Sequence, residues 1–161
     1  MTQGDFALFA GTPTAGAVRH QVVGAATPPA INAGELVLKT LGNQYVIKMA
    51  TNKPVVATDF VAGVSIYAST ETATVDGLVT VQPLLPGQIW LIKPKVAATW
   101  NTQALYNALQ GARVLIDVTG GAATLLAADG ATSGCVVEYL DVAKHAGFVA
   151  ISFRDGCRYT A

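Results

Sequence analysis

Hydrophobic positions along this chain recur mainly with the two-residue period of a half-buried strand, in short segments bounded by glycine, proline, asparagine or aspartate. In GFVAISFR (147–154), for example, Val149, Ile151 and Phe153 alternate with smaller or polar residues. The expected strands are 35–40, 44–49, 62–69, 78–84, 88–93, 112–118, 123–128, 134–140 and 147–154. About eight or nine short strands at this spacing predict a mainly β fold, a compact antiparallel β-barrel or sandwich.

One segment has helical spacing, and it predicts a single short α-helix over about 100–110. Thr99 or Asn101 is suited to cap its N-terminus, and Gly111 is suited to the position after its last residue. The apolar residues at helical spacing are Leu105, Ala108 and Leu109. So short a helix is marginal in isolation, and we therefore expect this stripe to dock on the sheet and the helix to plug one end of the barrel.

The first 33 residues are rich in glycine, alanine, proline and threonine and show no sustained period. They are either a disordered leader or an extended arm that becomes ordered on a neighbouring subunit. We therefore expect a flexible N-terminal arm over 1–33 and a single β-rich domain over 34–161. The candidate partner-binding residues on the arm are Phe6, Leu8, Phe9, Arg19, Val22 and Val23.

Composition indicates a surface that is partly covered by a partner. Hydrophobic residues make up 52% of the 161 residues and charged residues only 12%, against about 25% in an average domain. So few charges leave a weakly repelling, adhesive surface, and we therefore expect a partner to cover part of it. Ten basic and ten acidic residues cancel without forming a run, which argues against nucleic acid, and no apolar segment reaches membrane-spanning length.

Two cysteines and two histidines lack the spacing of a metal site, so we expect neither a metal nor a cofactor. Cys135 and Cys157 are expected to be free thiols in a reducing compartment, with a bridge between them left open.

Residues that carry chemistry are scattered. Ser65 lies in a strand without the second glycine of a nucleophile elbow, and the histidines, His20 and His145, are expected at the surface. The candidate carboxylates, which a sugar hydrolase would use in pairs, are Asp117, Glu138 and Asp141, and their spacing enforces no pairing. We expect a protein that is not an enzyme.

Trp90 and Trp100 have two interpretations. They are either packing residues or a platform on which a carbohydrate stacks. We favour packing.

The segment LPGQIWLIKPKVAATWNTQALYNALQGARVLID and its continuation to SFR, residues 85–154, resembles small structural proteins of tailed bacteriophages. The upstream INAGELV (31–37) and DFVAGVSIYAST (59–70) resemble head-decoration proteins, which carry a flexible N-terminal arm before a small β-rich body. The resemblance covers about three quarters of the chain and rests on recurrent sequence features rather than on catalytic motifs.

The resemblance implies a capsid decoration, or cement, protein that binds the exterior of the expanded head and stabilises the mature lattice. It implies the major capsid protein as partner, a homo-oligomer with a trimer favoured and a dimer possible, assembly in the host cytoplasm, and a place on the virion exterior. The alternatives are another phage structural subunit, from the tail or for head completion, and a host-adhesion module whose tryptophans bind glycans. A small β-barrel enzyme is a third class.

Overall fold

The computed structural model describes residues 6–10, 16–24, 31–39, 45–118, 124–128 and 130–158, of which 6–10 and 126–128 are described by their backbone. Two β-sheets and one short α-helix account for the regular structure, so the predicted mainly β class is confirmed. The strands are β1 (Phe6–Ala10), β2 (Val18–Val22), β3 (Leu36–Lys39), β4 (Val46–Lys48), β5 (Phe60–Ser65), β6 (Gly77–Gln82), β7 (Ile89–Pro94), β8 (Arg113–Asp117), β9 (Thr124–Ala128), β10 (Cys135–Val137) and β11 (Val149–Phe153). The helices are α1 (Gln103–Leu109) and the 3-10 turns η1 (Ala97–Trp100) and η3 (Asp155–Cys157).

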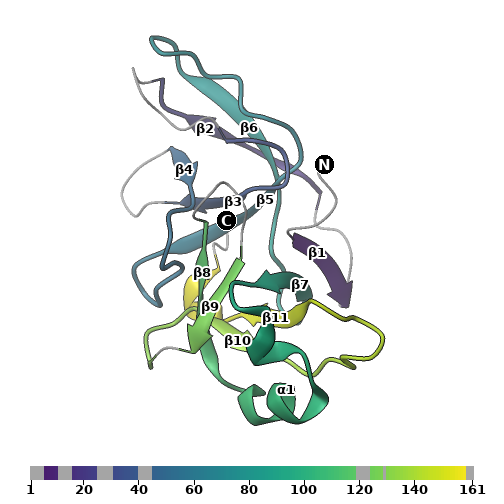
Figure 1. The fold of residues 1–161 in the computed structure, drawn as a ribbon. Coiled ribbons are helices and arrows are strands. Elements are labelled where there is room, and N and C mark those ends of the chain that lie inside the picture. The colour runs from purple at the N-terminus through teal and green to yellow at the C-terminus, as the bar shows by residue number, and fades with distance from the viewer. Residues whose placement is uncertain are drawn as a thin grey trace.

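The five-stranded sheet has the order β2-β6-β5-β3-β4 and occupies the upper part of Figure 1. Its two edge strands approach each other at a bridge between Gln21 and Tyr45, so the sheet curls around a small core of its own. That core consists of Val22, Ile31, Val37, Val46, Ala62, Val79 and Val81. β-Branched side chains pack well on a pleated, curved surface, which suits this valine-rich interior.

The six-stranded sheet has the order β1-β7-β11-β10-β8-β9. β9 also pairs with β7, through Lys93 with Thr124 and Pro94 with Leu125, so the sheet closes back on itself as a half-barrel. This pairing is parallel, whereas the sequence pattern predicted an antiparallel fold throughout. The other pairings among the described strands of this sheet are antiparallel.

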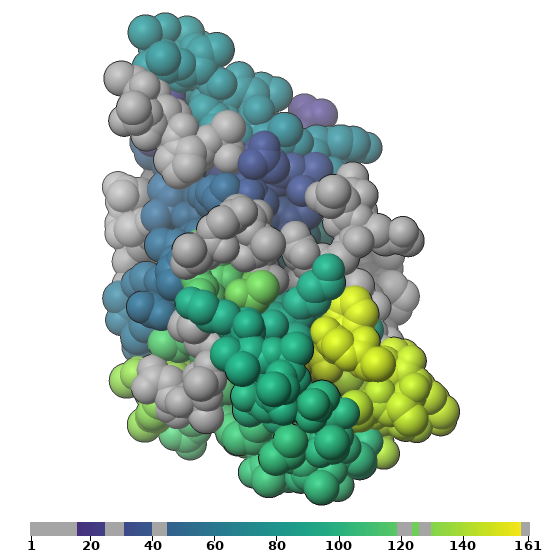
Figure 2. Space-filling view, in the orientation of Figure 1, coloured from purple at the N-terminus to yellow at the C-terminus, as the bar shows by residue number. Residues whose placement is uncertain are grey.

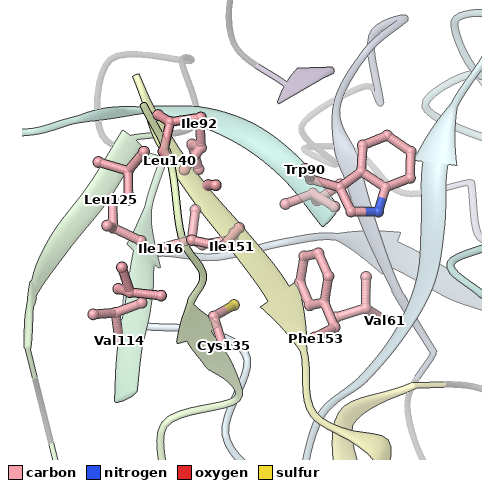
Figure 3. Close-up of a cluster of buried hydrophobic side chains, with 14 of the residues drawn as sticks. Val61, Trp90, Ile92, Val114, Ile116, Leu125, Cys135, Leu140, Ile151 and Phe153 are labelled. Carbon is pink, nitrogen blue, oxygen red and sulfur yellow. The ribbon is translucent and has the colours of Figure 1, made fainter. Parts of the chain in front are cut away.

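The two sheets share the larger core. Leu36, Leu38 and Val61 from the five-stranded sheet belong to the same buried cluster as Trp90 and Phe153 from the six-stranded sheet. Figure 3 shows Val61 facing the rings of Trp90 and Phe153, with the half-barrel interior beyond them. Because burial of apolar area is the dominant favourable contribution to folding, a core that draws on both sheets joins them in one folding unit.

The helical segment begins later than the sequence predicted. The chain first makes the 3-10 turn η1, and the N-cap of α1 is then Thr102, whose hydroxyl accepts a hydrogen bond from the Leu105 N–H at 3.3 Å. Thr99 and Asn101, the expected caps, lie before it. Gly111 has a φ of 80° after the last helical residue, as expected of a helix terminator.

The face of α1 that packs on the body differs from the predicted stripe. Leu105 and Ala108 are exposed, and of the three stripe residues only Leu109 packs against the core. Tyr106 is fully buried instead, with its ring edge-to-face on Trp100 at 5.7 Å between centroids. The expectation that Leu105 and Ala108 dock on the sheet is therefore wrong, because the tyrosine combines a large ring with a hydroxyl that meets buried backbone groups.

The N-terminal strands belong to the body. β1 pairs with β7 and β2 pairs with β6, both antiparallel, so residues on either side of the predicted boundary between 1–33 and 34–161 share both sheets. In this structure the described part of the expected arm is thus bound to its own chain. Open strand edges present unpaired N–H and C=O groups, and the edges of β6 and β7 are satisfied here by these two strands.

Candidate interaction surface

Three of the predicted partner-binding residues, Phe6, Leu8 and Phe9, lie in β1. Phe6 pairs with Ile92 and Leu8 with Trp90, while Phe9 falls at the irregularity between Leu8 and Ala10. Their backbone is thus placed by β7 of the same chain, and their side chains lie outside the described part of the structure.

The other three, Arg19, Val22 and Val23, lie in or just after β2. Val22 is only 5% exposed and belongs to the smaller core, so its predicted role as a partner contact is not available in this conformation. Arg19 is exposed opposite Thr80, and Val23 is exposed beside the loop that precedes β6. Strand alternation puts Arg19 and Val23 on the outer face of the sheet and Val22 on the inner face.

Arg19 and Val23 share this outer face with an exposed leucine, because Leu78 pairs with Gln21 between them. The Gly24 N–H donates to the Asp76 carboxylate at 2.8 Å, which holds the end of β2 against the loop that carries the exposed Val75. We call these four residues, Arg19, Val23, Val75 and Leu78, the hairpin surface. It lies at the upper end of the molecule in Figure 1.

Ser65 has a structural role. It is 1% exposed, its hydroxyl donates to the Asn32 carbonyl at 2.5 Å, and its oxygen accepts from the Glu35 N–H at 3.0 Å. A hydroxyl bonded twice to the backbone ties the segment before β3 to the end of β5.

His20 lies on β2 opposite Val79 and is partly buried. Burial, and secondarily the charge of Lys39, lowers the pKa of its imidazole below the ordinary value. The neutral form is therefore favoured at this edge of the sheet.

The three candidate carboxylates have separate partners. Asp117 is buried where β9 rejoins β7; it forms an ion pair with Lys95 and accepts from the Thr51 hydroxyl at 3.1 Å. Asp141 lies in an exposed turn, where the hydrogen bond from Lys144 lowers its pKa. Asp117 thus clamps the seam of the half-barrel, while Asp141 orders a turn.

Glu138, the third carboxylate, lies in a groove of about 430 Å³ on the outer face of β10 and β11. Its carboxylate accepts a hydrogen bond of 2.5 Å from the Ser152 hydroxyl. The neighbouring Arg154 guanidinium donates to the carbonyls of Ala131 and Ser133 at 2.8 and 3.0 Å. Both charged side chains are thus hydrogen-bonded within the protein at the groove.

The two thiols are free and buried, which settles the question of a bridge left open by the sequence. Burial raises the pKa of Cys135 well above its ordinary value, and burial raises the pKa of Cys157 to about 11. A Cβ added to Gly134 would lie 2.6 Å from the Cys157 sulfur, so the thiol packs directly on this backbone. Both thiols are thus packing groups.

Among the described residues no group of three or more histidine, cysteine, aspartate or glutamate side chains is placed to hold a metal ion. Within the same ranges, no helix is long and apolar enough to cross a membrane.

Both tryptophans are core residues, at 6% exposure for Trp90 and 3% for Trp100. A sugar stacks on an exposed aromatic face, so neither indole forms the carbohydrate platform considered above. The host-adhesion alternative was based on Trp90 and Trp100, and in this structure neither indole is exposed for a glycan to stack on.

A second exposed apolar region lies at the opposite end of the molecule, around α1. Val96 is 58% exposed and Leu105 is 46% exposed. We call the exposed apolar residues of this end the α1 surface: Val96, Ala97, Ala98, Ala104, Leu105 and Ala108. The sequence does indicate this exposed region, because no charged residue lies between 96 and 112. We missed it because we expected the apolar residues of the helix to dock on the sheet.

Comparisons with protein-family models, with curated proteins and with solved structures found no match to this chain. The resemblance to phage head proteins therefore remains a prediction from the sequence.

Proposed function

We propose that this chain is a structural protein of a tailed-bacteriophage virion that binds the capsid exterior and stabilises the mature lattice. The observation that carries the proposal is the hairpin surface, where apolar side chains stay exposed in a chain with only 12% charged residues. Exposed apolar side chains that gather on one face mark contact sites more often than scattered single residues do. The resemblance over 85–154 supplies the capsid as the partner.

The hairpin surface replaces the free arm as the proposed capsid contact. An arm that reached across the major capsid protein would first have to leave β6 and β7, and its backbone hydrogen bonds to them would be lost. The hairpin surface is already formed and includes Arg19 and Val23 from the predicted set. A preformed surface avoids the cost of ordering a segment, about 1–2 kcal/mol per residue.

The stabilisation follows from mass action. A protein that binds only the expanded lattice stabilises it by about 2.7 kcal/mol per site when its free concentration is a hundredfold above Kd. Because the lattice repeats the same site many times, weak contacts add up over the shell.

The test uses expanded heads of the phage that encodes the chain, prepared without this protein. We expect the full chain to bind these heads to saturation, in numbers that scale with the capsomers, and to raise the temperature at which they release DNA. We expect Leu78→Glu to weaken head binding at least tenfold, because a buried carboxylate without a partner opposes the contact.

Tyr139→Glu is the matched control, because Tyr139 is also large and exposed but lies after β10, away from the hairpin surface. It should bind heads as the wild type does. Failure of the folded wild-type chain to bind heads would overturn the proposal. Binding to tails or to a single vertex in a few copies would favour the tail or head-completion alternative.

A further inference from the structure

The strand β2 closes the curled five-stranded sheet. It pairs with β6 through all five of its residues, from Val18 to Val22, and Gln21 forms the bridge with Tyr45 at the start of β4. Figure 2 shows the upper end of the molecule formed by the teal segment that contains β6, the strand against which β2 lies. If β2 left this position, the sheet would lose both its edge strand and its closure.

His20 lies on the inner face of β2. Val22 is buried in the smaller core, and strand alternation puts the side chain of His20 on the same side. The partner of His20 on β6 is Val79, which belongs to that core as well. The imidazole is itself partly buried, so it lies at the border of an apolar interior.

A lysine on the same inner face acts on this imidazole. Lys39 ends β3 and pairs with Val46, a residue of the smaller core, so its side chain is on the side of the sheet that His20 faces. The positive charge of Lys39 opposes protonation of His20. Both the apolar border and the neighbouring cation therefore disfavour an imidazolium here.

The other charged groups on the elements around β2 have partners of their own. Lys48 on β4 forms an ion pair with Glu35. Asp76, before β6, accepts from the Gly24 N–H at 2.8 Å and from the Tyr45 hydroxyl at 3.4 Å. β5 and β6 contain no charged residue. The carboxylates near β2 are thus engaged with groups other than His20.

We propose that His20 makes β2 an acid-sensitive latch, which opens from β6 and from Tyr45 when the imidazole is protonated, while the six-stranded sheet stays folded. The charged ring loses hydration in the closed position and regains it when the strand opens. Such opening can be local, because the free energy of opening differs between the parts of a protein.

The direction of the pH effect follows from proton linkage. Burial, and secondarily the charge of Lys39, lowers the pKa of His20 in the closed form. In the open form the imidazole titrates near its ordinary pKa of about 6.5. The closed form therefore has its full stability above about pH 6.5. It loses stability as the pH falls from there through the lowered pKa, because the open form takes up the proton first.

The latch also bears on the hairpin surface. Arg19 lies on β2 and Val23 follows it, so opening of the strand separates these two residues from Leu78 and Val75. Acid should therefore weaken binding to heads in the wild type. This consequence rests on the proposed function, whereas the latch itself is a property of the free chain.

Hydrogen exchange of the full-length chain, measured by mass spectrometry at about pH 5 and about pH 7.5, tests the latch. After correction for the intrinsic exchange rate, we expect protection of the 18–22 amides to fall at least about threefold more at the acidic pH than protection of β11 does. His20→Gln is neutral at both pH values and should abolish this difference. His145→Gln is the matched control, since His145 lies in the turn after Asp141, and this variant should behave as the wild type does.

Lys39→Gln serves if His20→Gln does not fold. It removes the secondary cause of the lowered pKa, so the acid effect on β2 should become smaller but persist. Unchanged protection of β2 in the wild type, an equal loss in wild type and folded His20→Gln, or a loss of the same size in β11 would overturn the latch. So would an acid effect of wild-type size in folded Lys39→Gln.

Head binding is measured separately, at both pH values. A chain that ignores heads at about pH 7.5 removes the capsid proposal alone, because the exchange experiment contains no heads. Acid-weakened binding that His20→Gln restores would support the latch and its effect on the hairpin surface together.

Discussion

The hydroxyl of Tyr106 accepts a hydrogen bond of 2.9 Å from the backbone N–H of Ala150, in the middle of the six-stranded sheet. The same hydroxyl donates to the carbonyl of Glu138, so a single helical side chain satisfies polar groups on the two neighbouring segments β11 and 138–140. These hydrogen bonds, together with the burial of the Tyr106 ring, hold α1 against the half-barrel.

Tyr106→Phe keeps the ring and removes only these hydrogen bonds. We expect the free energy of unfolding to fall by about 1–3 kcal/mol, because a buried N–H and a buried C=O lose a partner. Urea denaturation followed by circular dichroism measures the change. Tyr139→Phe, on an exposed side chain nearby, should leave the free energy of unfolding nearly unchanged.

The ionisation of Tyr106 should also make the free energy of unfolding depend on pH. Burial raises the pKa of Tyr106 to about 12, the hydrogen bond from Ala150 opposes the rise, and the charge of Glu138 adds to it. In the unfolded chain tyrosine titrates near pH 10, so the contribution of Tyr106 to stability is complete below about pH 10. As the pH rises from there through the folded pKa, the unfolded state releases the proton first and stability falls, by up to about 1.4 kcal/mol per pH unit.

Tyr106→Phe lacks this group, so the difference in stability between wild type and variant should narrow as the pH rises through this range. Denaturation at a series of alkaline pH values gives the two slopes. Parallel curves for the two proteins would show that the phenol ionises with its ordinary pKa in the folded state.

Gly63 is the position in β5 where a side chain fits least well. Its φ is +151°, and an added Cβ would lie 2.0 Å from the Gln82 carbonyl oxygen. We expect Gly63→Ala to lower the free energy of unfolding by at least about 3 kcal/mol, since the backbone of β6 would have to move. Gly87→Ala is the comparison: its φ is +74° but its surroundings are open, so only conformational strain of about 1–2 kcal/mol applies.

Truncations should distinguish the contributions of the two N-terminal strands, β1 and β2, to stability. Removing residues 1–10 deletes β1 and uncovers the edge of β7, and we expect a folded protein of lower stability. Removing residues 1–30 also deletes β2, takes Val22 out of the smaller core and uncovers β6, and we expect this chain to lose cooperative unfolding. Thermal and urea unfolding of both truncations measures this, and a fully stable 31–161 fragment would contradict it.

Much of the strand content could be predicted because it is encoded locally. Alternation in 147–154 and the turn at Pro86-Gly87 predicted β11 and the start of β7, and the structure confirms both. The helix was predicted at the right place for the same reason, although its cap moved to Thr102. Local period and turn chemistry are short-range properties, so one sequence suffices to read them.

The remainder depends on contacts between distant residues. β1 and β2 show no clear period, and their stability comes from β7 and β6, which lie far along the chain. The face of α1 that packs on the body could not be predicted from the sequence pattern either. Spacing favoured Leu105, whereas the bonds of Tyr106 to Glu138 and Ala150 decided which face is buried.

The candidate site was predicted only in part, because it too depends on contacts between residues that are distant in the sequence. Arg19 and Val23 do lie together on an exposed face, but their neighbour Leu78 is contributed by β6 and Val22 turns into the core. Only the strand register, which depends on tertiary pairing, reveals which of these residues share a surface.

The pairing of β1 with β7 sets an order of events during synthesis. Phe6 emerges from the ribosome long before Ile92, its partner, and the strand cannot find its place until β7 has been made. β1 therefore stays without its partner strand until β7 has been made, and during that interval the apolar residues of β1 lack the sheet edge with which they pair in the fold.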